Sequence, residues 1–183
     1  MIPGYPQRAD GDPPREVFPR VFGPVEQKLL AIYLNDHLAG SVLGSELARR
    51  VARENRGSPL GEFLERLLAE ILEDKQTLER VLQATGVRPS PIKPRVAWAL
   101  EKVGRLKLNG RIREYSPLSR LLELEGLTAG IAAKRSLWQA LGLASDPRLA
   151  EFDFDALRSR AEAQLEEIEP HRLEASRLVL GSR

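Results

Sequence analysis

The chain has 183 residues, of which 42% are hydrophobic, 30% are charged and 5% are aromatic. Its 30 leucines outnumber the 17 valines and isoleucines together, a balance that favours helices over strands. The 28 basic and 26 acidic residues nearly cancel, which excludes a strong overall field for polyanions, and the lack of cysteine excludes disulfides and thiolate chemistry. We therefore expect an all-α protein. Because no long apolar run is present, we expect it to be cytoplasmic and without a membrane span.

Prolines are concentrated before the first predicted helix and again near the middle of the chain. Six prolines within residues 1–24 predict an extended or disordered arm. Amphipathic periodicity then predicts helices at about 25–55, 59–85, 117–141 and 155–180. The second and third open on Ser-Pro, with serine as the cap and proline in the first turn. A crossover at 87–116, expected to contain one short helix, joins two helical hairpins, so residues 25–183 are predicted to form a four-helix bundle.

Each predicted helix carries ionisable residues near the middle of its apolar stripe. A charge on an inward face needs a partner or a metal, because burying it alone is very unfavourable. We therefore expect a shared polar layer inside the bundle; the alternative is that these side chains reach from the edge of the stripe to water. The residues expected in this layer are Asp36, His37, Asp74, Lys75, Glu125, His171 and Arg172.

This layout resembles the ferritin-like superfamily, in which two helical hairpins and a long crossover place carboxylates and histidine in the middle of a bundle. The resemblance spans about residues 25–180 and is similar to an uncharacterised bacterial, rubrerythrin-like branch. The segments that carry it include YLNDHLAGSVLGSELARR, SPLGEFLERLLAEILEDKQTLERVLQATG, SPLSRLLELEGLTAGIAAKRSLW and LEEIEPHRLEA. Members that hold two irons use one Glu from each of two helices and Glu-x-x-His from each of the other two.

The residues of this chain depart from that ligand pattern. The resemblance places Asp36 and Glu125 at the two single carboxylates. Neither Glu-x-x-His pair is complete, because Gln76 stands where one histidine would be and Ile168 stands where one glutamate would be. A di-iron oxidase or an iron store is therefore not the expected function.

Positive charge also falls where the family would place metal ions. Lys75 and Arg172 are expected in the predicted layer itself, and a guanidinium satisfies carboxylates directly while repelling a divalent cation. We expect an ion-pair layer instead of a di-metal centre, hence a non-catalytic binding or structural module without a cofactor. The alternative is an iron- or manganese-binding redox protein. Its ligands would be Asp36, Asp74, Glu125 and His171.

The crossover is the most basic part of the chain. Eight basic residues against two acidic ones give residues 87–116 a net charge of +6. A patch of this kind is compatible with binding to nucleic acid or an anionic surface. The simpler interpretation is that a short helix shows its charges to water. The patch comprises Arg95, Lys102, Arg105, Lys107, Arg111 and Arg113.

The third predicted helix is apolar on two faces. We expect one face to point to the core; it contains Leu118, Leu122, Ala129, Ala132, Ala133 and Ala140, with Glu125 among them. The second face then needs a cover, which is the crossover helix, the N-terminal arm or a second copy of the chain in a homodimer. It contains Leu124, Leu127, Ile131 and Trp138. No phosphate-binding glycine loop, nucleophile elbow or His-Glu-x-x-His motif is present, so no catalytic residue is predicted.

Overall fold

The computed structural model describes residues 24–90 and 115–181. These ranges contain four long helices, one short 3-10 helix and no strand, so the predicted all-α class is confirmed for them. The helices are α1 (Pro24–Glu54), α2 (Pro59–Ala84), α4 (Pro117–Gly142) and α5 (Phe154–Leu180), with the 3-10 helix at Pro147–Leu149. Every boundary of the four agrees with its predicted position to within one residue. The arm before residue 24, the short crossover helix and the basic patch lie outside the described residues.

The helix ends form where the sequence signals predict them. The amide of Gly61 donates a hydrogen bond to the Ser58 hydroxyl at 3.1 Å, and Ser119 does the same to Ser116, so both Ser-Pro pairs cap their helices. Gly57 follows α1 with a φ of 78° and Gly86 follows α2 with a φ of 69°. Glycine adopts this left-handed conformation without steric cost, so each ends its helix cleanly.

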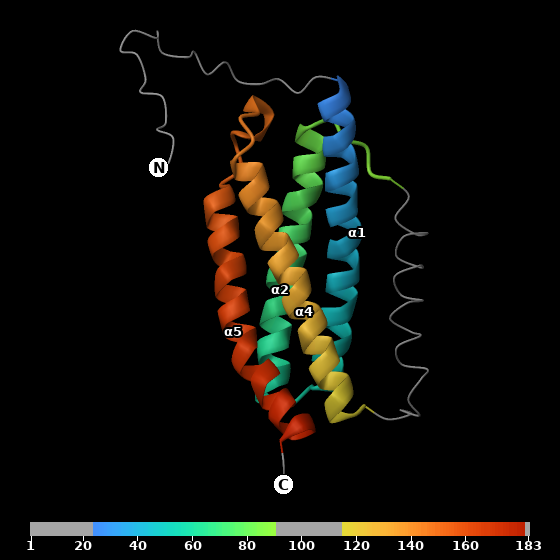
Figure 1. Cartoon of the computed structure of the whole chain (residues 1–183), viewed down its shortest axis with the longest axis vertical. Coiled ribbons are helices and arrows are strands. Elements are labelled where there is room, and N and C mark those ends of the chain that lie inside the picture. Colours follow the sequence, from blue (N-terminus) through green and yellow to red (C-terminus); the bar gives the residue numbers. More distant parts are fainter. Residues whose placement is uncertain (1–23, 91–114, 182–183) are drawn as a thin grey trace, which may run out of the picture.

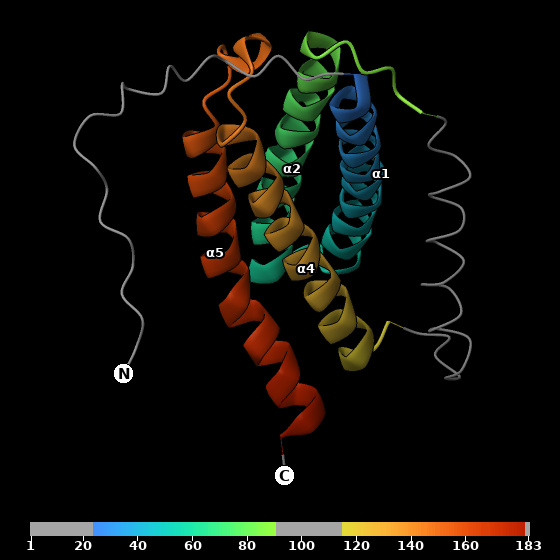
Figure 2. The same ribbon diagram turned by 45° about the horizontal axis from the view of Figure 1, so that its top comes forward.

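The helices form two antiparallel hairpins, α1–α2 and α4–α5, that pack against each other (Figure 1). In that view α1 and α5 run downward, whereas α2 and α4 run upward. Helix α1 packs against both α2 and α4, and α5 packs against α4 and, less extensively, α2. The parallel helices α2 and α4 therefore lie diagonally opposite each other. Figure 2 shows the same arrangement, with the C-terminal end of α5 extending beyond the α1–α2 connection. No helix in the described ranges has the length and apolar character to cross a membrane.

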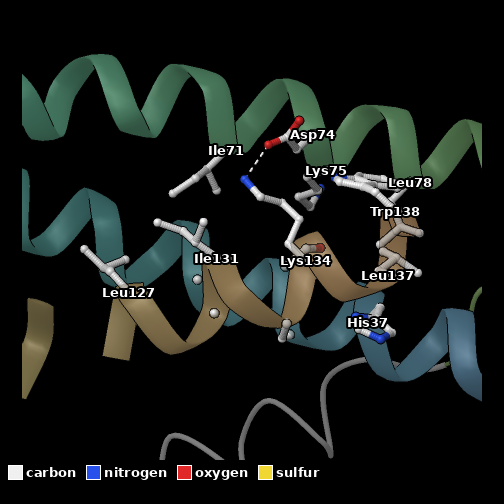
Figure 3. A pocket seen from close by; sticks show the side chains of 15 residues that line it. His37, Ile71, Asp74, Lys75, Leu78, Leu127, Ile131, Lys134, Leu137 and Trp138 are labelled. Carbon is white, nitrogen blue, oxygen red and sulfur yellow. Dashed lines mark hydrogen bonds and ion pairs between the residues drawn. The ribbon is translucent and has the colours of Figure 1, made fainter. Parts of the chain in front are cut away.

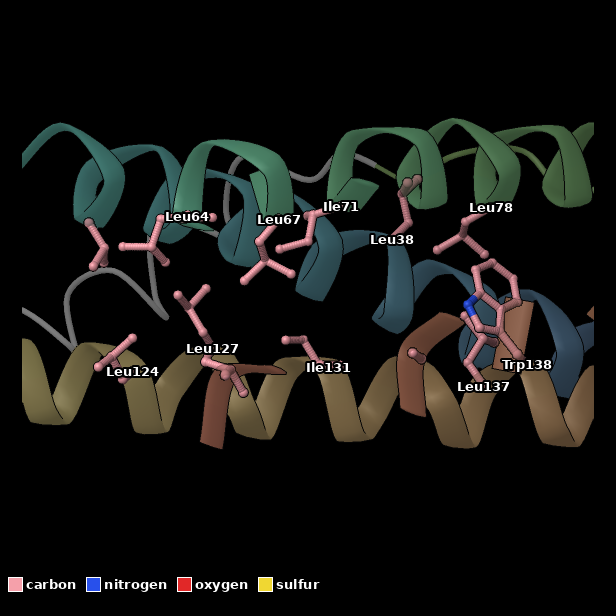
Figure 4. Close-up of a cluster of buried hydrophobic side chains, with 14 of the residues drawn as sticks. Leu38, Leu64, Leu67, Ile71, Leu78, Leu124, Leu127, Ile131, Leu137 and Trp138 are labelled. Carbon is pink, nitrogen blue, oxygen red and sulfur yellow. The ribbon is translucent and has the colours of Figure 1, made fainter. Parts of the chain in front are cut away.

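Helix α4 is rotated about its axis relative to the prediction, so that the face expected to need a separate cover is the buried one. Leu124, Leu127, Ile131 and Trp138 are each at most 2% exposed and point toward α1 and α2 (Figure 4). The face that we expected to point inward is on the outside, where Leu122 is 51% exposed. Burial stabilises in proportion to the apolar area removed from water. Burying the face with large side chains is therefore more favourable than burying the alanine-rich face. These four residues are covered within the chain and do not form a surface for a second copy.

Both ends of the crossover are attached to α1. Asn35, about three turns into α1, accepts a hydrogen bond from the Ser90 amide at 2.6 Å and donates to the Arg88 carbonyl at 3.3 Å. Asn55, just after the end of α1, donates to the Tyr115 hydroxyl at 2.8 Å. The chain thus leaves the first hairpin beside the N-terminal half of α1 and enters the second hairpin beside the C-terminal end of α1.

Candidate functional site

A buried carboxylate lies in the middle of the bundle. Asp74, on α2, is 2% exposed, and its two oxygens accept hydrogen bonds from two cations of the other hairpin. Lys134 of α4 pairs with one oxygen, as the dashed line in Figure 3 shows, and Arg160 of α5 pairs with the other. Charge-assisted bonds of this kind offset the cost of taking a carboxylate out of water.

Three further polar side chains complete this network. Lys134 also donates to the Gln164 side-chain oxygen at 2.6 Å, and the Gln164 amide donates to Glu70 at 2.7 Å. Arg160 also donates to Glu73 at 3.0 Å. We call this network the Asp74 layer. Its members are Glu70, Glu73, Asp74, Lys134, Arg160 and Gln164. All three acids belong to α2, and the cations and the amide belong to α4 and α5.

Burial and charge act in opposite directions on Lys134. Its side chain is 15% exposed, and this burial lowers the pKa of its ammonium below the ordinary value. The charge and hydrogen bond of Asp74 raise that pKa again, although desolvation is the larger effect. The ammonium and the Asp74 carboxylate therefore depend on each other: each would be costly to bury without its partner.

Two predicted members of the interior layer are on the surface. Asp36 and Glu125 are both exposed, so their prediction as interior residues is wrong. For Glu125 the reason is the rotation of α4 about its axis. For Asp36 the reason is that the inward face of α1 includes polar residues, such as buried Asn35 and Ser45, whose side chains bond to α1 backbone carbonyls. In the sequence, the inward face of α1 is therefore not a continuous apolar stripe, and its position could not be identified from hydrophobic residues alone.

Two other predicted members lie away from the Asp74 layer. His171 is half-buried and its ring stacks on Phe63 at 4.7 Å, where it lines a separate groove near the α1–α2 connection. Arg172 pairs with Glu169, one turn earlier on the same helix. The prediction that these two residues share one layer with Asp74 is therefore wrong. Asp74 is the predicted residue that lies at the centre of the observed network.

Sequence reasoning missed the two cations that hold Asp74. Lys134 lies between Ile131 and Trp138 on the buried stripe of α4, so the correct orientation of that helix would have placed it inside. Arg160 lies four residues before Gln164, the buried polar residue of α5. Positions three and four residues apart share a helix face, and this spacing is the signal that was available for both.

A cavity of about 110 Å³ adjoins the Asp74 layer between α1, α2 and α4 (Figure 3). Asp74, Lys75 and Lys134 lie on its wall, and predicted residue His37 faces it from α1. Most of the remaining lining is apolar. It consists of Gly40, Ser41, Gly44, Ile71, Leu78, Leu127, Gly130, Ile131, Ala133, Leu137 and Trp138. Lys75 pairs with Glu79 of its own helix at 2.6 Å.

The structure does not bring the four residues of the predicted metal site together. Asp74 already gives both oxygens to cations, while Asp36 and Glu125 face outward and His171 lies at another level of the bundle. No group of three or more histidine and carboxylate side chains in the described ranges is arranged to hold a metal ion. Comparisons of the chain with protein families, curated proteins and solved structures found no match.

Proposed function

We propose that the chain is a ferritin-like bundle that acts as a non-catalytic binding or structural module in the cytoplasm. In this proposal the Asp74 layer stands in place of the di-metal centre. The two-hairpin order of the helices and the long crossover support the ferritin-like assignment. The observation that carries the functional part is the pairing of Asp74 with both Lys134 and Arg160.

That pairing argues against a metal for a chemical reason. A divalent cation binds through free carboxylate oxygens, and its charge is repelled by a nearby ammonium or guanidinium. Both oxygens of Asp74 already accept hydrogen bonds from these cations, so neither is free to bind a metal ion. The layer therefore works as an internal ion pair that joins the two hairpins.

Metal analysis tests the proposal. The protein is produced in medium supplemented with iron and manganese, purified without chelator and assayed by elemental analysis. We expect less than one equivalent of either metal, and the same low value for Asp74→Ala. The matched control, Glu79→Ala, removes a carboxylate outside the layer. Stoichiometric metal that is lost in Asp74→Ala but kept in Glu79→Ala would overturn the proposal.

A further inference from the structure

A second, more polar groove lies at the end of the bundle where α2 and α4 begin and α5 ends (Figure 2). Its volume is about 210 Å³, and polar atoms form more of its surface than apolar atoms do. The α1–α2 connection contributes Asn55 and Ser58, α4 contributes Arg120, and α5 contributes His171 and Glu174. This groove shares no residue with the cavity beside the Asp74 layer, so it is a separate site.

Arg120 and Glu174 bring opposite charges to this groove, and neither forms an ion pair with a described residue. The guanidinium of Arg120 lies over the Tyr115 ring, 5.7 Å from its centre, and this contact does not neutralise its charge. The Nε atom of Arg120 is enclosed, but its two terminal nitrogens are not. Glu123, the nearest carboxylate along α4, pairs with Arg50 at 2.5 Å. The guanidinium of Arg120 and the exposed carboxylate of Glu174 are therefore both accessible to a ligand.

These two charges favour a ligand that carries one negative and one positive group. A simple anion would be attracted by Arg120 and repelled by Glu174, and a simple cation would experience the reverse. A zwitterion is attracted by both residues when its carboxylate faces the guanidinium and its ammonium faces the carboxylate. The charges of the groove thus favour a small zwitterion over a singly charged molecule.

Apolar side chains of the groove adjoin the charged ones. Leu178 follows Glu174 by four residues, so it lies one turn further along the same face of α5. Leu60 of α2 also lines the groove. Leu178 is 61% exposed, and covering it with the apolar atoms of a ligand is favourable. The lining therefore suits a molecule with both charges at one end and an apolar group at the other, which is the form of an α-amino acid.

We propose that this groove binds an α-amino acid with a branched apolar side chain. The carboxylate of the amino acid pairs with Arg120, its ammonium pairs with Glu174, and its side chain packs against Leu60 and Leu178. Because the groove lies outside the Asp74 layer, this site does not depend on whether the protein binds a metal.

Three related ligands test the proposal in NMR titrations of ¹⁵N-labelled protein. L-Leucine carries both charges, 4-methylpentanoate lacks the ammonium, and 3-methylbutylamine lacks the carboxylate. We expect leucine to shift the amide signals of the groove residues saturably. It should bind about two- to fivefold more tightly than either partial ligand, which is the range for one partly exposed ionic contact.

Two variants assign the charges of the ligand to the residues of the groove. Arg120→Gln should abolish the preference for leucine over 3-methylbutylamine and leave the Kd of this amine unchanged, because the amine has no carboxylate. Glu174→Gln should abolish the preference for leucine over 4-methylpentanoate and leave the Kd of that acid unchanged. Arg66→Gln and Glu166→Gln remove exposed charges outside the groove and are the matched controls, expected to bind all three ligands as the wild type does.

Several results would overturn the proposal. One is the absence of a saturable shift with leucine, and another is a partial ligand that binds as tightly as leucine. A third is an equal weakening of all three ligands by Arg120→Gln or Glu174→Gln, which would indicate a structural effect. Glu174 is exposed, so its replacement should leave the fold intact and the test remains decisive even where Arg120→Gln disturbs the packing on Tyr115.

Discussion

Lys134 reaches across the bundle from α4 to Asp74 on α2, the helix diagonally opposite. The ion pair thus joins the two hairpins, and the charges are divided between them: the acids of the Asp74 layer belong to the first hairpin and its cations to the second. A polar interior contact of this kind adds little net stability compared with apolar packing, but it penalises any arrangement that separates the partners. We infer that the layer fixes how the hairpins align.

Removing the acid of this pair should be costly. Asp74→Leu leaves Lys134 and Arg160 without their shared carboxylate, so we expect the free energy of unfolding to fall by about 3 kcal/mol in urea titrations. The double variant Asp74→Leu/Lys134→Met should lose clearly less than the two single variants added together, because the buried ammonium is gone as well. Glu79→Ala, which unpairs the more exposed Lys75, should cost no more than about 0.5 kcal/mol. Equal losses for Asp74→Leu and Glu79→Ala would contradict this account.

His37 should make the fold sensitive to mild acid. Burial lowers the pKa of His37 below 6.5, and the neighbouring Asp36 charge compensates only in part. The unfolded chain therefore binds this proton more tightly than the folded chain, so the free energy of unfolding decreases as the pH falls from 6.5 through the folded pKa. Urea midpoints between pH 7.5 and 5 should decrease more in the wild type than in His37→Gln. Carboxylates titrate in both proteins, so parallel curves would show that His37 does not contribute.

Two helical glycines should respond oppositely to alanine. A Cβ at Gly61 would lie 2.2 Å from the Asn55 backbone oxygen, so Gly61→Ala must push the start of α2 away from the end of α1. We expect a loss of about 1–3 kcal/mol in the free energy of unfolding. At Gly40 nothing lies within 4 Å of an added Cβ, and Gly40→Ala should instead raise stability by about 0.5–1 kcal/mol through helix propensity. Thermal and urea unfolding of both variants provides the measurement, and a stabilising Gly61→Ala would refute the close approach.

Helix existence and boundaries could be predicted because they depend on local chemistry. Serine caps, first-turn prolines and left-handed glycines act on the few residues next to them, so the positions of the helix ends can be found from short stretches of sequence. Helix rotation could not be predicted for α4, because two of its faces are apolar and periodicity alone does not rank them. Side-chain size would have ranked them, since the buried face holds Trp138 and Ile131 whereas the exposed face is rich in alanine.

The sequence predicted that a polar layer lies inside the bundle, but it identified only some of the residues in that layer. That a mid-bundle carboxylate such as Asp74 needs partners follows from the cost of burying a charge. Which residues supply those partners depends on how four helices meet, and that information is not local. Lys134 and Arg160 come from different helices, 60 and 86 residues away along the chain.

Asn35 and Asn55 hold the two ends of the crossover on one helix, and this sets the minimum length of any link between the hairpins. The 20 residues that separate them correspond to about 30 Å along α1. An extended chain covers that distance in about ten residues, whereas residues 91–114 provide 24. Fewer than half of these residues would be enough to bridge the two anchor points, so the length of the link is not set by the distance that it spans.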